Sequence, residues 1–147
     1  MAEPITSLPN GLNVGTTNTG AAFQVDGTEI TASATELNET ALVFDLANVS
    51  AASSAWVVAP HAGDITKIYS VIDTALTTAV AVLDPQIGGT TMTGGTFAIA
   101  AAAVAGEVDS STPTAANTVT AGQAIEIATD GGSTNASKAV ITMILTR

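Results

Sequence analysis

The second half of the chain is built from short apolar runs that are rich in β-branched residues and separated mostly by turn residues. Gly88 and Gly89 lie between two such runs, and Gly94 with Gly95 marks another turn. Short strands at this spacing predict an all-β fold, an antiparallel β-sandwich or jelly roll, because βαβ units would need helical segments between the strands. The seven predicted strands cover residues 55–60, 64–72, 79–87, 90–93, 96–100, 123–129 and 138–146.

The first half has a different pattern. Residues 1–20 hold two Pro, three Gly, three Asn and four Thr, and their apolar residues follow neither the strand period nor the helix period. This composition predicts an extended arm that becomes ordered only against a partner. Asp26 and Gly27 follow the arm, and an Asp-Gly pair between short strand-like runs predicts a small β-hairpin.

One short helix is predicted after this hairpin. Ser33 and Glu36 have the spacing of a capping box, and Leu37, Ala41 and Leu42 follow at helical spacing. The predicted helix, residues 34–41, has about two turns and is too short to be stable alone in water. It therefore needs a packing partner, and the residues expected to contact that partner are Ile30, Leu37, Leu42 and Phe44.

A small-residue linker, "SAASSA" at residues 50–55, separates the two halves. The predicted organisation is an arm, hairpin and short helix in residues 1–54 and a β-sandwich in residues 55–147. Residues 98–119 are rich in Ala, and the Thr and Gly around them favour a strand followed by a loop over a short helix.

The last predicted strand, "KAVITMILT", is apolar on both of its alternating faces. A strand in a single sandwich meets water on one face, so a second cover is expected, either the N-terminal segment or a neighbouring subunit. Val140 and Ile144 form one face. The opposite face consists of Ile141, Met143 and Leu145, and we expect these three residues to contact a partner.

The composition supports self-association and narrows the class of partner. Ala occurs 28 times and Thr 24 times, so we expect a core built largely from small side chains, in which a monomer buries little apolar area per residue.

The net charge is -10, and the cationic residues are only Lys67, Lys138 and Arg147. Nucleic acid and anionic membranes are therefore not expected as partners, because both are bound through clustered Lys and Arg. Residues 1–66 carry acids only, which fits a basic partner surface or, more simply, solubility.

Few residues carry reactive chemistry. No Cys is present, and His61 is the single histidine, placed in a loop between Pro60 and Gly63. Glu107 with Asp109, or Asp130 before two glycines, could contribute to a calcium loop, but solvated turn carboxylates are favoured because the calcium-loop spacing is missing. We expect no enzymatic activity, no cofactor and no bound metal, and we expect Trp56 to be a buried residue at the start of the sandwich rather than a ligand platform.

The segment "GTEITASATELNE", residues 27–39, resembles a box, roughly G-x-x-I-T-A-(S/T)-A-x-E-L-N, of tailed-bacteriophage structural proteins. In those proteins the box lies between an N-terminal attachment segment and a β-rich domain. The segments "HAGDITKIYSVIDTAL", "IGGTTMTGGTFAIA" and "TAGQAIEIATDGG" look like β domains of predicted phage head or tail proteins. The resemblance implies a virion component and assigns no catalytic residue.

The expected function is decoration or cementing of a bacteriophage capsid, with the major capsid protein and further copies, as a homotrimer, as partners. The start "MAEPITSLPNG" has neither a basic nor an apolar signal-peptide region, and the longest apolar run is too short to span a bilayer. We therefore expect synthesis in the host cytoplasm and a final place on the capsid surface. The alternative is a receptor- or carbohydrate-binding β module of a tail fibre or head fibre, which would require exposed aromatic rings.

Overall fold

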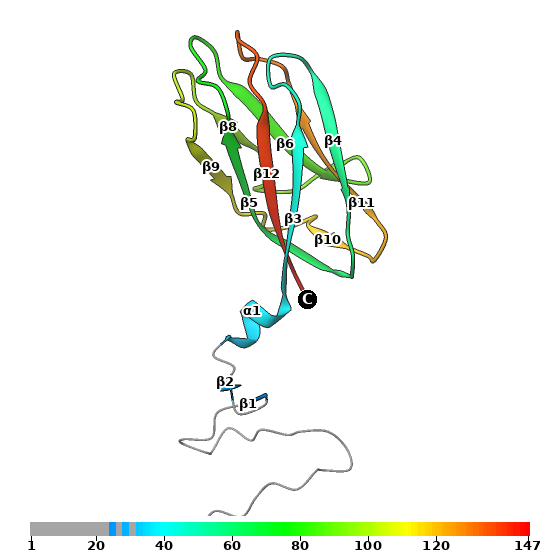
Figure 1. Cartoon of the computed structure of the whole chain (residues 1–147). Coiled ribbons are helices and arrows are strands. Elements are labelled where there is room, and N and C mark those ends of the chain that lie inside the picture. The colour runs from blue at the N-terminus through cyan, green and yellow to red at the C-terminus, as the bar shows by residue number, and fades with distance from the viewer. Residues whose placement is uncertain (1–23, 26–27, 30–31) are drawn as a thin grey trace, which may run out of the picture. The chain divides into compact units, whose positions relative to one another are not determined.

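The computed structural model describes residues 24–25, 28–29 and 32–147 of the chain. The chain divides into two units, Met1–Leu37 and Asn38–Arg147, and the second unit is a sandwich of two antiparallel sheets, drawn as two layers in Figure 1. The predicted all-β sandwich is confirmed. Its strands are β3 (Glu39–Leu46), β4 (Ser53–Val58), β5 (Gly63–Ile72), β6 (Ala81–Ile87), β7 (Thr90–Thr91), β8 (Phe97–Ile99), β9 (Val108–Ser111), β10 (Thr118–Val119), β11 (Ala124–Thr129) and β12 (Ala139–Thr146).

The first sheet, which we call the β12 sheet, has the order β10-β5-β12-β3, and β9 pairs with β5 beside β10. Its centre is the pairing of β12 with β5 on one side and with β3 on the other. The β5–β12 register shifts between Ile144 and Leu145, which face Lys67 and Ile65, so Thr66 is an extra residue on β5. This bulge lets Ile65 and Ile68, three positions apart, both point into the core.

The second sheet, which we call the β11 sheet, has the order β4-β11-β6-β7, and β8 pairs with the first half of β6. Gly88 and Gly89 connect β6 to β7 with φ angles of 58° and 78°. Positive φ at both central residues is the requirement of a type I′ turn, which glycine meets without steric cost. The two-residue hairpin predicted at this position is therefore confirmed.

The core lies between the two sheets and is made of inward-pointing side chains from alternate positions. Each of β6, β11 and β12 alternates between buried and half-buried residues along most of its length. The largest fully buried side chains are Leu46, Ile65, Ile68, Ile72, Leu76, Leu83, Met92, Ile99, Ile125, Ile127, Ile141 and Met143. A core of Ile, Leu and Met from both layers, rather than of Ala, holds the sandwich together.

The first unit contains a hairpin and the start of α1 (Ala34–Asn38). The hairpin strands β1 (Gln24–Val25) and β2 (Thr28–Glu29) pair antiparallel, which confirms the predicted hairpin. Residues 26–27 and the predicted arm, residues 1–20, lie outside the described residues. The capping box is confirmed, because the Ser33 amide donates to Glu36 Oε2 at 2.7 Å and the Glu36 amide donates to Ser33 Oγ at 3.2 Å. The amide of Ser33 also lowers the pKa of the exposed Glu36 carboxyl.

The predicted helix of residues 34–41 is too long. α1 ends at Asn38 and β3 begins at Glu39, so Ala41 and Leu42 belong to a strand. β3 pairs with β12 over its whole length and is therefore part of the sandwich. The structure divides the chain between Leu37 and Asn38, whereas the sequence led us to expect the boundary at residue 54. The Ala-rich segment 98–119 contains the end of β8, all of β9 and β10, and no helix.

Candidate interaction surfaces

The residues expected to contact a partner do not form one surface. Leu42 points inward from β3 and is buried in the core. Ile141, Met143 and Leu145 are fully buried between the sheets, so the contact surface expected on β12 is its inner face and not its outer one. This assignment is corrected, because buried side chains are occupied by their own core.

The other three expected contact residues have different positions. Phe44 lies on the inward face of β3, half-buried against the core cluster, and is also not a surface contact. Leu37 on α1 is 65% exposed, so it stays available for a partner. Ile30 lies outside the described residues.

The outer face of the β12 sheet carries a patch of apolar side chains around Thr142. It combines the outward positions of β3, β5, β9 and β12, and its most exposed members are Val43 and Val108, at 60% and 61%. The strand register arranges these residues in rows across the sheet. One row contains Val108, Val71 and Val140. In the next row, Thr142 lies between Tyr69 and Val43. We call this surface the valine–tyrosine patch, and it consists of Val43, Tyr69, Val71, Val108, Val140 and Ile144.

Charges border this patch at two places. Lys138 Nζ pairs with Asp45 Oδ2 at 2.8 Å, and both side chains are largely exposed. Lys67 Nζ donates to Thr112 Oγ1 at 3.0 Å and lies 5.7 Å from the centre of the Tyr69 ring. An apolar centre with a polar, charged rim is the usual arrangement of a protein–protein contact surface.

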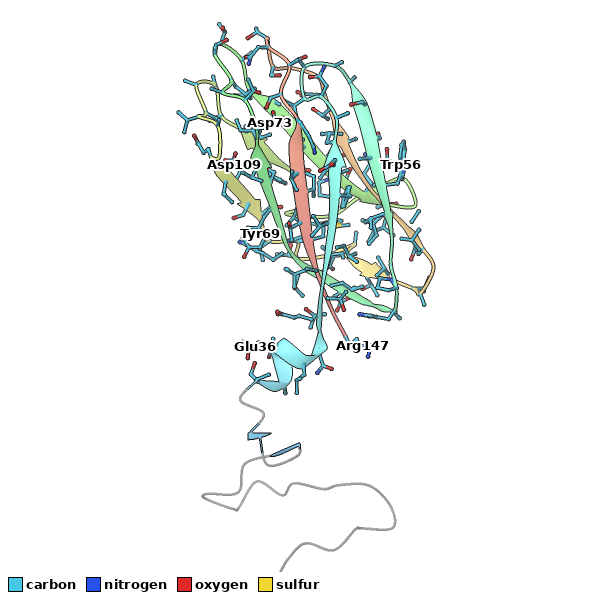
Figure 2. The ribbon with its side chains drawn as sticks, in the orientation of Figure 1. Glu36, Trp56, Tyr69, Asp73, Asp109 and Arg147 are labelled. Carbon is cyan, nitrogen blue, oxygen red and sulfur yellow. The ribbon has the colours of Figure 1, made fainter. Side chains whose placement is uncertain are left out.

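A second exposed surface lies on the outer face of the β11 sheet. Trp56 on β4 is 60% exposed, so the prediction that it is buried is wrong. Figure 2 shows Trp56 and Tyr69 on opposite sides of the sandwich. The register places Trp56 beside Glu126, Glu126 beside Gln86, and Gln86 beside Thr91, in one row across four strands. We call this row the Trp56 row.

Hydrogen bonds fix the polar groups at one end of the Trp56 row. Asp84 Oδ2 accepts from Gln86 Nε2 at 2.8 Å and from Thr91 Oγ1 at 2.9 Å, and Asp84 Oδ1 accepts from Thr96 Oγ1 at 2.7 Å. The half-buried Glu126 has no hydrogen bond or ion pair with any other residue of the described part of the chain. Asp84 is thus occupied, whereas the Glu126 carboxylate beside the Trp56 ring is available as an acceptor.

His61 and two of the candidate calcium ligands, Glu107 and Asp130, have hydrogen-bond partners within the protein. His61 Nε2 lies 2.9 Å from Thr40 Oγ1, and Nδ1 lies 3.0 Å from the Ala62 carbonyl oxygen, to which it donates because a carbonyl oxygen only accepts. Glu107 Oε2 accepts from the Val104 amide, and Asp130 Oδ1 accepts from the amides of Val82 and Gly132. Within residues 24–25, 28–29 and 32–147 no group of three or more His, Cys, Asp or Glu side chains could hold a metal ion.

Among the described residues, no helix has the length and apolar character needed to cross a membrane. Comparisons of the chain with protein families, with curated proteins and with solved structures each found no match. The two exposed faces and the residues of the ITASATELN segment are therefore the features that bear on function.

The sequence pattern predicts a face of the last strand that needs a second cover, although the expected contact residues lie on the opposite face, and it does not predict the exposed face around Trp56. The alternation in "KAVITMILT" identified two faces of β12 correctly, and the structure shows that the set with the larger side chains is the inner one. In "AWVVAP" every residue except Pro is apolar, so the pattern gave no indication that Trp56 points outward. The polar residues of the Trp56 row come from separate strands, and only the register brings them together.

Proposed function

We propose that the protein is a structural virion component that decorates or cements a bacteriophage capsid. The exposed valine–tyrosine patch is the observation that carries this proposal, because an apolar sheet face of this kind is a site for association with another protein. The N-terminal segment with its ITASATELN box contacts the major capsid protein, and the patch contacts a neighbouring copy in a homotrimer.

Three further features support the proposal. The ITASATELN segment resembles the box that precedes β-rich domains in phage structural proteins. Leu37, in that segment, is exposed although it is a large apolar residue, and a partner surface would cover it. The Lys138–Asp45 pair at the border of the patch offers both signs of charge to a second copy of the same chain.

The test is a matched pair of substitutions on the two sheets. Val43→Asp introduces a charge into the valine–tyrosine patch, and Val58→Asp introduces the same charge on β4, where Val58 is 58% exposed. We expect Val43→Asp to lower the mass of the purified protein from trimer to monomer and to reduce its occupancy on purified particles, because burying an unpaired carboxylate at an interface is costly. Val58→Asp should change neither measurement. Light scattering and cryo-electron microscopy of particles provide the two readouts.

Two results would count against this proposal. A wild-type protein that is a stable monomer and is absent from purified particles would remove the assembling role altogether. Equal effects of Val43→Asp and Val58→Asp would show that the valine–tyrosine patch has no special part in association.

A second candidate function is a carbohydrate- or receptor-binding β module of a tail fibre or head fibre. One observation favours it, namely that the single Trp of the chain is exposed on a sheet face beside polar side chains. A screen of the purified protein for glycan binding tests it, and a protein that binds no glycan or receptor would leave only the structural role.

A further inference from the structure

The Trp56 row joins an aromatic face to hydrogen-bonding groups that are not used within the protein. Trp56 projects from β4, the edge strand of the β11 sheet, and its ring is largely exposed (Figure 2). Directly opposite residues of an antiparallel pair have Cβ atoms about 4.5–5.5 Å apart, so Glu126 lies within reach of a molecule stacked on the indole. An exposed aromatic ring with a hydrogen-bonding group beside it offers a ligand both an apolar face and a polar contact, which makes this position a binding-site candidate.

The polar groups of the row are held in position before any ligand binds. Gln86 donates one amide hydrogen to Asp84, which fixes the orientation of its side chain and leaves its Oε1 and its second N–H free within the described contacts. Asp84 is itself held by Thr91 and Thr96. Gln86 lies two strands from Trp56, which corresponds to about 10 Å at the usual strand spacing. The row thus presents a flat ring, a carboxylate acceptor and an amide with both a donor and an acceptor over the length of a disaccharide.

The charge of this face restricts the class of ligand. No Lys or Arg occurs in β4, β6, β7, β8 or β11, and all three cationic residues lie in β5 or at the ends of β12. An anionic ligand would meet Glu126 and Asp84 without a compensating cation. A strongly basic peptide fits less well than a neutral ligand, because Asp84 already accepts three hydrogen bonds and only the Glu126 carboxylate is free. The complementary ligand is a neutral molecule with an apolar ring face and several hydroxyl donors.

We propose that the Trp56 row is a binding site for a neutral oligosaccharide. One sugar ring stacks on Trp56, hydroxyl groups of that ring donate to the Glu126 carboxylate, and the next ring hydrogen-bonds to the Gln86 amide. The inference deepens and rests on the second candidate function, and it is independent of the valine–tyrosine patch on the other sheet.

The experiment uses Trp56 as its own reporter, because it is the only Trp in the chain. The full-length protein is screened on an array of neutral, N-acetylated, sialylated and sulfated oligosaccharides, and the best neutral sugar is then titrated while indole fluorescence and its quenching by acrylamide are recorded. We expect binding to neutral sugars with a shift in emission and reduced quenching. Trp56→Ala should weaken binding on the order of tenfold or more, as expected for loss of an aromatic stacking contact.

Two further variants keep the result interpretable if Trp56→Ala is poorly folded. Trp56→Phe retains an aromatic face and should keep part of the affinity, and Glu126→Gln removes an acceptor without changing shape and should weaken binding severalfold. Val104→Ala, an exposed position in the loop before β9, is the surface control and should bind like the wild type. Circular dichroism of each variant checks that the β fold is intact.

Three outcomes would overturn the assignment. They are the absence of binding to every sugar on the array, binding that survives Trp56→Ala unchanged, and a preference for the sialylated or sulfated sugars over neutral ones. A protein that fails these tests but still assembles on particles would leave the capsid proposal in place, so the two failures are distinguishable.

Discussion

At the scale of single residues, the pairing of β9 with β5 brings polar groups to the inner side of the β12 sheet. Asp109 lies opposite Ser70 on β5, and Ser111 lies opposite Ile68. The hydroxyl groups of Ser70 and Ser111 are buried and have no hydrogen-bond partner within the described chain. Burial raises the pKa of the Asp109 carboxyl, and the negative charge of Glu107 raises it further. Ionised Asp109 therefore destabilises the folded state.

The raised pKa of Asp109 makes a prediction about stability and pH. Between the ordinary pKa of an Asp and the raised one, the folded state binds more protons than the unfolded state, so this group contributes stability at low pH that is lost as the pH rises through the folded pKa. Asp109→Asn should therefore be more stable than the wild type at pH 7, and the difference should shrink below the ordinary pKa. Urea unfolding across this pH range measures both effects. An Asp109→Asn variant that is less stable at neutral pH would show that the ionised carboxylate has a favourable partner.

At the scale of elements, β3 shows why a helix was predicted where a strand forms. Leu37, Ala41 and Leu42 match the helical period, but Leu42, Phe44 and Leu46 also match the strand period, and the two patterns overlap in the same residues. Eight residue pairs with β12 decide between them in favour of the strand, because pairing with a central strand satisfies the backbone groups that a short isolated helix cannot protect. The capping box at Ser33 fixed the start of α1 correctly but contained no information about its end.

The two faces of β12 predict different responses to the same substitution. Ile141 is fully buried between Ser70 and Phe44 in the register, whereas Ile144 lies half-buried on the outer face between Lys67 and Ala41. Ile141→Ala should lower the free energy of unfolding by about 2–5 kcal/mol through loss of buried area and formation of a cavity. Ile144→Ala should cost about 1 kcal/mol or less in the monomer, because its side chain already meets water.

Urea unfolding of both variants at one protein concentration provides the comparison. If Ile144→Ala were as costly as Ile141→Ala, the outer face of β12 would be covered as completely as the inner one in solution. The same measurement at rising protein concentration then separates cover by a second copy from cover within the chain, because only association depends on concentration.

At the scale of the whole molecule, the fold class followed from the sequence more directly than the surfaces did. Turn residues such as Gly88 and Gly89 and the alternation in residues 138–146 are local signals, and they predicted the sandwich and most of its strands. Which face of a strand points into the core is decided only when the two sheets pack together. An all-apolar run such as "AWVVAP" fits either direction, so whether Trp56 is core or surface depends on contacts with distant strands. The Trp56 row depends on the register of β11 with β4 and with β6, strands that lie far apart in the sequence, and it has no sequence motif.

The division between Leu37 and Asn38 predicts which truncations leave the sandwich intact. Removing residues 1–37 keeps all strands of both sheets, so the remaining chain should fold with a free energy of unfolding close to that of the full-length protein. Removing residues 1–54 deletes β3 and the start of β4, which exposes one edge of β12 and takes Leu42 and Leu46 out of the core. That shorter chain should not unfold cooperatively, because the loss of two buried leucines alone costs about as much as the whole stability of a typical domain. Thermal unfolding of the two truncated proteins, followed by circular dichroism, separates the two boundaries.

A mass measurement on the chain lacking residues 1–37 then shows which region assembles the trimer. If this shorter chain is a trimer, self-association belongs to the valine–tyrosine patch. If it is a folded monomer, self-association belongs to the N-terminal segment.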